Sequence, residues 1–316
     1  MPLPSVHIVI VNWNAGEQLR ACLHSLATAS RTAYTLTTIT VVDNASHDRS
    51  TTGLDDLGLP LQIIHNPDNR GFGTACNQGA EHSQSDYLLF LNPDVRVEKD
   101  TLDQLLACAA RAKNQKTGIF GPQLVGHDGQ IQRLCARFPT PARLLPQLLG
   151  LDRSFPRCFP GHFMHEWDHR HTRLVEQVPG GFLLIRRSLF HQLGGFDTRF
   201  FMYFEDVDLA YRARQAGWYT LFCATSRAIH AKGGTTGQIR ALRLFYFLRS
   251  RVLYIHKHFG KCAGTATLLA TLLIEPLPRL AASLLRRSGH DTRHTLRAYL
   301  MLWRTAGALV GTRRNS

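Results

Sequence analysis

The first third of the chain alternates between short apolar runs and amphipathic stretches. Unbroken apolar runs are typical of strands buried on both faces of a sheet, and they occupy residues 6–11, 39–42, 61–64 and 87–91. Apolar residues at helical spacing occupy residues 19–27, 74–83 and 101–112. Strands that alternate with helices imply right-handed crossovers. The pattern therefore predicts an α/β fold, with a mixed, mostly parallel sheet flanked by helices, in a domain that spans residues 1–239.

The last 77 residues have a different character. The chain of 316 residues carries 37 Lys and Arg against 23 Asp and Glu, a formal net charge of +14. Residues 240–316 hold 14 of those basic residues and only two acidic ones. Two apolar runs, residues 263–274 and 277–285, are separated by charged and proline residues, which argues against one spanning helix. We expect a basic helical extension that lies on an anionic membrane surface; a helical cap packed on the first domain is the alternative.

The basic C-terminal segment also permits a nucleic-acid-binding protein. Between residues 245 and 259, aromatic side chains alternate with Arg and Lys, as in a surface that stacks bases and contacts phosphates. The apolar content of residues 263–285 exceeds what a nucleic-acid groove needs, so a membrane is the preferred partner.

Seven scattered cysteines form no C-x-x-C motif, so we expect neither a disulfide framework nor a thiolate zinc site. A reducing cytosol fits best, and the first residues show no secretory signal.

Polar residues follow three of the four predicted strands. Asn12, Trp13 and Asn14 end the first strand, Asp43 and Asn44 end the second, and Asn92 and Asp94 follow the fourth. Each Asn or Asp alone is typical of a turn or a helix cap. Ligands of such sheets bind beyond the carboxyl ends of the strands. The three ends together therefore predict a polar ligand site.

Two glycines, Gly71 and Gly73, precede the second predicted helix. Cys76 stands where a dinucleotide-binding fingerprint requires glycine, and no Walker lysine follows. We therefore predict a turn and helix N-terminus near a diphosphate-bearing ligand, without a Rossmann or P-loop signature.

Three acidic residues, Glu205, Asp206 and Asp208, follow the aromatic run at residues 201–204. Asp208 is explained by the helix dipole, which favours acidic residues in a first turn. Neighbouring aromatic rings can desolvate Glu205 or Asp206, which would tune a carboxylate as a general base.

Six segments, in this order, give the chain a recognisable pattern: VIVNWN, VVDNAS, NRGFGTACNQG, LFLNPDV, GGFDTRFFMYFEDVDLAYRARQAGW and AIHAKGG. The chain resembles the family 2 glycosyltransferases of the GT-A fold, most closely the bacterial rhamnosyltransferase-like branch. The resemblance covers about residues 6–237. It implies an inverting transfer of a sugar from a nucleoside diphosphate sugar to an acceptor hydroxyl, with a divalent metal ion (Mg²⁺ or Mn²⁺) on the diphosphate.

The resemblance also implies roles for individual residues. Asp206 corresponds to the catalytic base, and Asp94 and His230 to the metal ligands. Asn92 stands at the first acid of the D-x-D metal motif, a departure that leaves Asp94 as the main carboxylate. The implied nucleoside and donor-site residues are Asn12, Trp13, Asn14, Asp43 (which would read the base), Asn44, Arg70, Gly71, Asn77, Asn92, Gly181 and Glu205.

The branch suggests a dTDP- or UDP-linked donor, with rhamnose as the sugar. It also suggests an acceptor glycan linked to polyprenyl diphosphate, in cell-envelope polysaccharide synthesis. We therefore expect a cytoplasmic enzyme associated with the inner face of the plasma membrane, with no nucleic-acid partner.

Residues 165–169 spell H-E-x-x-H, the zincin motif. A zincin needs this motif on a helix with a third ligand downstream. Here it follows Pro160 and Gly161, so an exposed loop is predicted and a zinc metalloprotease is the minor alternative.

Overall fold

The computed structural model describes residues 2–111, 116–148, 151–155, 157–231, 240–285 and 288–310. These residues form two compact units. The α/β unit comprises Met1–Phe138, Phe163–Phe201 and Glu205–Thr235, and the helical unit comprises Pro139–His162, Met202–Phe204 and Thr236–Ser316. The predicted domain boundary at residue 239, the last residues of the AIHAKGG segment and the predicted helix end at Ala112 lie outside the described residues.

The α/β unit contains all four strands and three helices predicted for the first third of the chain. Its strands are β1 (Ser5–Asn12), β2 (Thr35–Asn44), β3 (Leu61–Asn66), β4 (Tyr87–Leu91), β5 (Val95–Val97), β6 (Thr117–Val125), β7 (Arg173–Val175), β8 (Phe182–Arg186) and β9 (Tyr219–His230). Its helices are α1 (Glu17–Ala27), α2 (Phe72–Ala80), α3 (Thr101–Ala110), α6 (Arg187–Gln192) and α7 (Glu205–Gln215), with a 3₁₀ turn at Asp55–Leu57.

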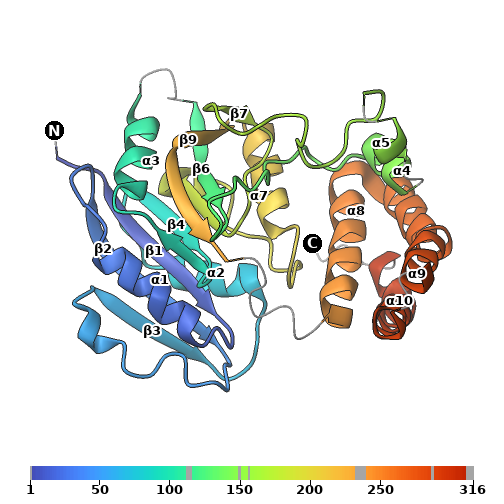
Figure 1. Ribbon diagram of the computed structural model, residues 1–316, viewed down its shortest axis with the longest axis horizontal. Coiled ribbons are helices and arrows are strands. Elements are labelled where there is room, and N and C mark those ends of the chain that lie inside the picture. The colour runs from blue at the N-terminus through green and yellow to red at the C-terminus, as the bar shows by residue number, and fades with distance from the viewer. Residues whose placement is uncertain are drawn as a thin grey trace. The chain divides into compact units, whose positions relative to one another are not determined.

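The strands form one mixed sheet in the order β3-β2-β1-β4-β8-β6-β9-β5, and β7 lies beside β9 (Figure 1). Parallel pairs join β3 to β2, β2 to β1, β1 to β4 and β6 to β9. Antiparallel pairs join β8 to β4 and β6, and β9 to β5 and β7. The predicted mixed sheet is confirmed, but more of its strand pairs are antiparallel than the sequence predicts. The apolar pattern of a strand such as β8 does not indicate its direction in the sheet, so the sequence could not predict that β8 is antiparallel to its neighbours.

Helices cover both faces of the sheet, since alternate side chains of a strand point to opposite faces. Val6, Ile8 and Ile10 of β1 join a buried cluster with leucines of α1 and α3 (Figure 1). On the other face, Gly79 lets α2 approach Val9 closely. This two-sided burial explains why β1 is apolar throughout.

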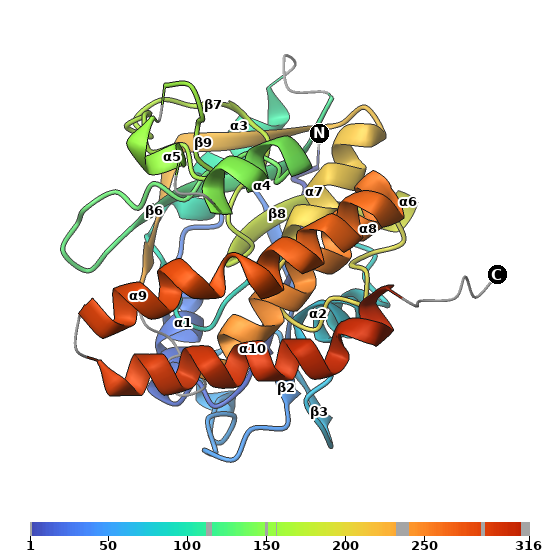
Figure 2. The same ribbon diagram turned by 90° about the vertical axis from the view of Figure 1, so that its right-hand side faces the viewer.

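The helical unit confirms the predicted helical C-terminus. Its helices are α4 (Pro141–Leu148), α5 (Leu151–Ser154), α8 (Arg240–Leu273), α9 (Pro276–Leu285) and α10 (Gly289–Val310). α10 runs beside α8 and α9 (Figure 2). Their shared core is Phe245, Leu248, Val252, Leu268, Ala298, Tyr299, Leu302 and Leu309. Within the same unit, the Phe204 ring packs on Phe247 and Tyr254 of α8.

A buried ion pair lies between α8 and α9. Arg251 and Glu275 are both about 7% exposed and are bonded to each other, and Arg279 Nη2 donates to Glu275 Oε1 at 2.7 Å. Burial alone would raise the pKa of Glu275, but the two guanidinium groups hold it below its ordinary value. A charged Glu275 therefore belongs to the folded core of this unit.

One segment of the described chain, Arg240–Leu285, is long and apolar enough to cross a membrane by length and composition. Its most apolar window has a mean hydropathy of 1.5 and is 24% buried. Gly260, with φ of 89°, interrupts the helix, and Glu275 and Pro276 follow its apolar part. The segment therefore contains bent, separate helices.

Candidate active site

The ends of β1 and β2 meet through buried polar contacts. Asn12 Nδ2 lies 3.0 Å from Asp43 Oδ1, and both residues are buried. The other oxygen of Asp43 lies 3.3 Å from His65 Nδ1 on β3. Trp13 and Asn14 follow directly and are partly exposed, and Asn14 Oδ1 accepts the His47 N–H. The structure thus brings the predicted nucleoside residues together at one edge of the sheet.

Asn44 holds the glycine-containing loop that precedes α2. Its Oδ1 accepts the Arg70 N–H at 3.0 Å, and its Nδ2 donates to Asn69 Oδ1 at 2.9 Å. Gly71 follows with φ of 83°, and the Arg70 side chain is about half exposed near Asp68. Asn44 therefore acts on this loop through the backbone, while the Arg70 guanidinium remains at the surface.

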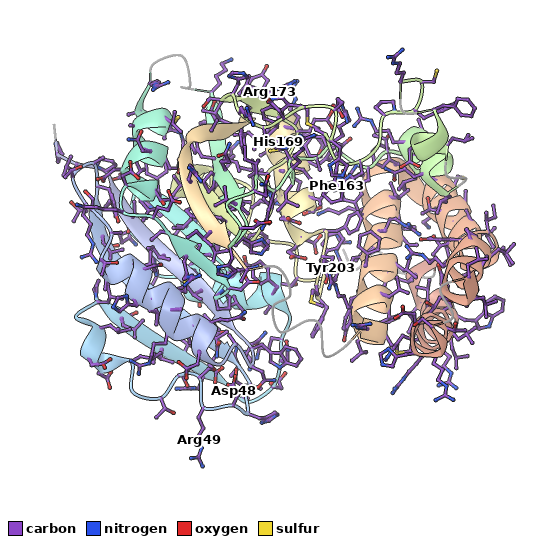
Figure 3. The ribbon with its side chains drawn as sticks, in the orientation of Figure 1. Asp48, Arg49, Phe163, His169, Arg173 and Tyr203 are labelled. Atoms are coloured by element: carbon purple, nitrogen blue, oxygen red, sulfur yellow. The ribbon has the colours of Figure 1, made fainter. Side chains whose placement is uncertain are left out.

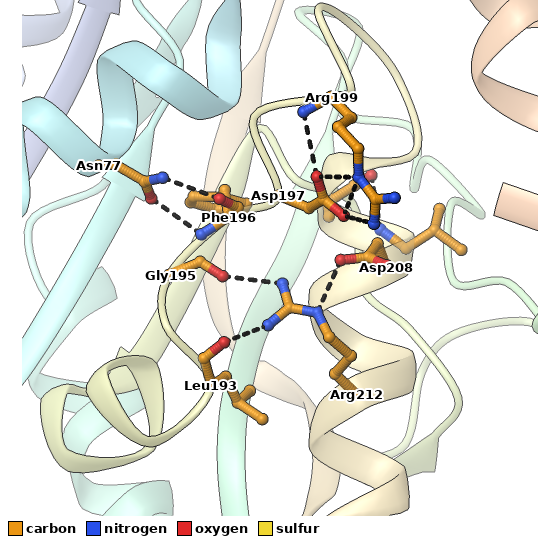
Figure 4. Close-up of polar contacts among 10 residues, drawn as sticks. Asn77, Leu193, Gly195, Phe196, Asp197, Arg199, Asp208 and Arg212 are labelled. Carbon is orange, nitrogen blue, oxygen red and sulfur yellow. Dashed lines mark hydrogen bonds and ion pairs between the residues drawn. The ribbon is translucent and has the colours of Figure 1, made fainter. Parts of the chain in front are cut away.

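Asn77 of α2 is bonded to the loop before α7. Its Nδ2 donates to Phe196 O, and its Oδ1 accepts the Phe196 N–H, both at 2.8 Å (Figure 4). Arg212 holds the same loop from the other side by donating to Leu193 O and Gly195 O. Asn77 therefore has a structural role here, and its part in donor binding stays a prediction.

Gly180 and Gly181 connect the predicted base to the end of β4. Gly180 N–H donates to Asp206 Oδ2 and Asn92 N–H donates to Gly181 O, both at 2.9 Å. A Cβ atom on Gly180 would lie 2.7 Å from Asp206 Oδ2, so only glycine fits there. The predicted residues Asp206, Asn92 and Gly181 thus lie in one continuous set of contacts.

The two neighbouring carboxyl groups differ in exposure. Glu205 is buried, and its Oε2 has no hydrogen-bond partner among the described residues. Burial and then the nearby Asp206 raise the pKa of Glu205 well above its ordinary value, which favours its protonated form. Asp206 is partly exposed and accepts the Val207 N–H and the Gly180 N–H. Burial raises the pKa of Asp206, and these two donors oppose that shift. Asp206 is therefore the better candidate for a base.

The turn before α7 has unusual backbone geometry. Tyr203 and Phe204 have φ angles of 65° and 68°, which side chains with a Cβ rarely adopt. α7 begins at the next residue, Glu205. Asp208 is in its first turn as expected from the helix dipole, but it is fully buried and is paired with Arg212 at 2.7 Å.

Asp94 and His230, the predicted metal ligands, lie side by side. β5 and β9 pair with Val95 opposite His230, which places His230 Nε2 3.5 Å from Asp94 Oδ2. Asp94 Oδ1 is buried and has no hydrogen-bond partner among the described residues. A buried acceptor without a donor is costly, so this oxygen suits a bound cation.

The protein alone offers an incomplete metal site. In the described part of the chain, no group of three or more His, Cys, Asp or Glu residues is arranged around one point. Mg²⁺ and Mn²⁺ sites of phosphate-binding enzymes often use one or two protein ligands, with substrate phosphates supplying others. The residues present therefore fit a metal ion that binds together with a diphosphate.

The H-E-x-x-H segment is a loop, as predicted. His169 is buried: its Nε2 accepts the Cys135 N–H, its Nδ1 faces Trp167 O at 2.9 Å, and its ring stacks on Trp167. Arg173 lies over the same Trp167 ring and close to His169 (Figure 3). Glu166 is paired with Arg137. With both ring nitrogens of His169 engaged, this segment does not form a zincin site.

Two residues that contact the predicted site residues, Gly180 and Gln132, are not predicted from the sequence. Gly180 adjoins the predicted Gly181, and its role depends on a contact with α7 that no local motif encodes. Gln132 contacts His230 from a hairpin almost 100 positions earlier in the chain.

Comparison with known proteins finds glycosyltransferases. Residues 7–131 match the family model of glycosyl transferase family 2. The chain is 29% identical over 272 residues to an N-acetylglucosaminyl-diphospho-decaprenol L-rhamnosyltransferase of Mycobacterium tuberculosis, covering 80% of this chain and 85% of the relative. It is 26% identical to a low-salt glycan biosynthesis hexosyltransferase, Agl10, of Haloferax volcanii, covering 72% and 67% of the two chains.

Two solved structures share the fold. A crystal structure of GalNAc-T7 with UDP, GalNAc and Mn²⁺ has a TM-score of 0.58 at 19% identity; it covers 80% of this chain, which spans about half (48%) of that longer protein. The mannosyltransferase PcManGT of Pyrobaculum calidifontis, in complex with GDP-Man and Mn²⁺, has a TM-score of 0.56 at 16% identity, covering 98% and 88% of the two chains. Both neighbours hold a nucleotide and Mn²⁺ in the same fold.

The family match ends before Asp206 and His230, yet the fold brings both to the strand ends that the match contains. The chain therefore is a glycosyltransferase with a GT-A fold, and its residues 7–131 match glycosyl transferase family 2.

Proposed function

We propose that this protein transfers a sugar, with inversion, from a nucleoside diphosphate sugar to a hydroxyl group of a lipid-linked glycan. The observation that carries the proposal is the contact chain Asp206–Gly180–Gly181–Asn92, which fixes a carboxylate beside the strand that leads to Asp94. An acceptor hydroxyl is a poor nucleophile and needs a positioned base to accept its proton. Asp206 supplies that base.

The donor site uses the ends of β1, β2 and β4. In this proposal Asp43 contacts the nucleoside base, and Asn12, Trp13, Asn14 and Asn44 line the nucleoside pocket. The donor diphosphate lies near Arg70, Gly71 and Asn77, with Asn92, Gly181 and Glu205 completing the donor side. Asp94 and His230 would hold a divalent ion, which stabilises the negative charge of the departing diphosphate when it is bound.

One relative of this chain suggests the class of acceptor. The Mycobacterium tuberculosis enzyme is a rhamnosyltransferase whose acceptor is N-acetylglucosaminyl-diphospho-decaprenol. We infer a dTDP- or UDP-linked donor, with rhamnose as the first candidate, and a polyprenyl-diphosphate-linked acceptor in cell-envelope polysaccharide synthesis. Such an acceptor would place the enzyme at the cytoplasmic face of the plasma membrane.

Purified protein should transfer sugar to a short-chain polyprenyl-diphosphate-linked GlcNAc in the presence of Mn²⁺. A panel of dTDP-, UDP- and GDP-linked sugars, each with and without the metal, identifies the donor by mass spectrometry of the product. The anomeric configuration of the product, measured by NMR, should be opposite to that of the donor. A product with retained configuration would contradict the proposed single displacement.

A membrane-binding face on α10 fits a lipid-linked acceptor. Leu296, Leu300 and Trp303 are 53%, 51% and 63% exposed and recur at helical spacing, so they form one stripe. The exposed Arg293, Arg297 and Arg304 lie along one side of this stripe, and the buried Ala298 and Leu302 lie on the opposite face of the helix. An amphipathic helix with Trp and Leu beside arginines is typical of binding in the plane of an anionic membrane.

Replacing Arg293, Arg297 and Arg304 with Gln should weaken sedimentation with phosphatidylglycerol vesicles by about 100-fold in the partition coefficient, since each basic residue near such a surface contributes ~1 kcal/mol. Salt should weaken binding of the unchanged protein in the same assay. The matched control replaces three exposed arginines of the α/β unit, Arg49, Arg111 and Arg170, with Gln (Arg49 extends into solvent in Figure 3). An equal loss of vesicle binding in both triple variants would show that binding depends only on the net charge of the protein and not on the arginines of α10.

A further inference from the structure

The imidazole of His230 is held by one side chain, that of Gln132. His230 Nδ1 lies 2.8 Å from Gln132 Oε1, and Gln132 Nε2 donates to the backbone oxygen of His230 at 2.9 Å. The second contact fixes the orientation of the amide, because only its NH₂ group can donate to a carbonyl. Gln132 Oε1 therefore faces the ring as an acceptor.

This arrangement selects one tautomer of the neutral ring. Since Gln132 Oε1 can only accept, the ring proton must lie on Nδ1. Nε2 then carries a lone pair and faces Asp94 Oδ2 at 3.5 Å. That separation exceeds the 2.7–3.2 Å of an N–H···O hydrogen bond. Two electron-rich atoms thus face each other without a proton between them.

Gln132 is itself held in place by backbone hydrogen bonds. Gln132 is 8% exposed and follows a hairpin in which Gly126 N–H donates to Gln130 O. Its own N–H donates to Leu124 O at 2.9 Å. β6 in turn pairs in parallel with β9, with Val125 opposite Ile229, the residue before His230. The amide and the imidazole are therefore brought together by two adjacent strands.

We propose that Gln132 is a positioning residue: it keeps His230 in the tautomer whose Nε2 can bind the divalent ion beside Asp94. The inference rests on the metal site proposed above. A second-sphere acceptor on the far nitrogen fixes the orientation of a ligating histidine, and its loss typically weakens metal binding 10–100-fold. The alternative is a structural role only, in which Gln132 ties the hairpin to the backbone of β9.

The test compares Mn²⁺ affinity, measured by electron paramagnetic resonance of the free ion, in the full-length protein and its variants with UDP or dTDP present. Gln132→Leu removes both contacts and should weaken Mn²⁺ binding by about 10–100-fold. Gln132→Glu keeps an oxygen acceptor for Nδ1–H but cannot donate to His230 O, so it should bind Mn²⁺ nearly as well as the wild type. Gln130→Leu makes the same change at an exposed position of the same hairpin and should have no effect.

A second readout needs no metal. ¹⁵N NMR of the His230 ring, at a pH where the ring is neutral, should show the proton on Nδ1 in the wild type and on Nε2 in Gln132→Leu. Wild-type Mn²⁺ affinity in Gln132→Leu, or an Nε2–H ring in the wild type, would overturn the role of Gln132. Equal losses in Gln132→Leu and Gln132→Glu would support the structural role instead. If wild-type protein and Asp94→Ala bind Mn²⁺ equally weakly, the proposed metal site itself is wrong, and the inference falls with it.

Discussion

Asp206→Asn should lower the turnover number by roughly 10²–10⁴, the usual span for loss of a general base. Asparagine keeps the shape of the side chain but cannot accept the proton of the acceptor hydroxyl. Its amide oxygen can still accept the Gly180 N–H, so the link to Gly180 survives while the contact with the Val207 N–H is lost. Calorimetry should therefore show donor binding close to that of the wild type, while the transfer rate falls.

Glu205→Gln is the matched control for this variant. Burial and the nearby Asp206 favour the protonated form of Glu205, which glutamine resembles in shape and charge, so most activity should remain. If Glu205→Gln is inactive and Asp206→Asn is active, Glu205 is the base. Because burial raises the pKa of Asp206, the wild-type rate should fall with decreasing pH at a higher pH than for an ordinary aspartate. The midpoint belongs to the Glu205–Asp206 pair rather than to either group alone.

Arg212→Met should lower the free energy of unfolding by up to about 3–5 kcal/mol, the usual cost of breaking a buried ion pair by removing one of its members. Asp208 is fully buried and accepts a 2.7 Å hydrogen bond from Arg212 Nε (Figure 4). The same guanidinium donates to Leu193 O and Gly195 O, so the loop before α7 loses two contacts as well. Urea denaturation followed by circular dichroism measures the change.

Two further variants isolate the cause of that loss. Adding Asp208→Asn to Arg212→Met removes the buried negative charge and should recover part of the stability. Arg214→Met changes an exposed arginine of the same helix, which contacts only the Tyr219 ring among the interactions described, and should cost about 1 kcal/mol or less. A change of under about 1 kcal/mol in Arg212→Met would mean that Asp208 is compensated by other groups.

The sequence was most informative where the pattern is local. The four strands and three helices predicted for the first third of the chain follow from apolar runs and helical spacing, and the polar strand ends indicate a polar ligand site. The family resemblance further implies that Asp94 and His230 share a metal site, and the sheet places their side chains 3.5 Å apart. Those inferences need no knowledge of how distant segments pack.

Long-range contacts account for what the sequence did not predict. The direction of β8, the approach of Gly180 to Asp206 and the contact of Gln132 with His230 each depend on sheet register between segments far apart in the chain. Asn77 is a further example. The sequence predicts that it binds the donor, but in the structure both polar atoms of its side-chain amide are hydrogen-bonded to the backbone of Phe196. Residue type and spacing identify candidates, but partners are set by packing.

The left-handed turn at Tyr203 and Phe204 has a consequence for the evolution of the enzyme. Each non-glycine residue in that region costs on the order of 1–2 kcal/mol, and glycine would relieve the cost. At position 204, glycine would also lose the contacts of the buried Phe204 ring with Phe247 and Tyr254, and deletion of a buried phenylalanine ring costs about 3–5 kcal/mol. Selection for stability therefore does not favour glycine at Phe204, and Phe204→Gly should destabilise the protein in spite of the relieved backbone.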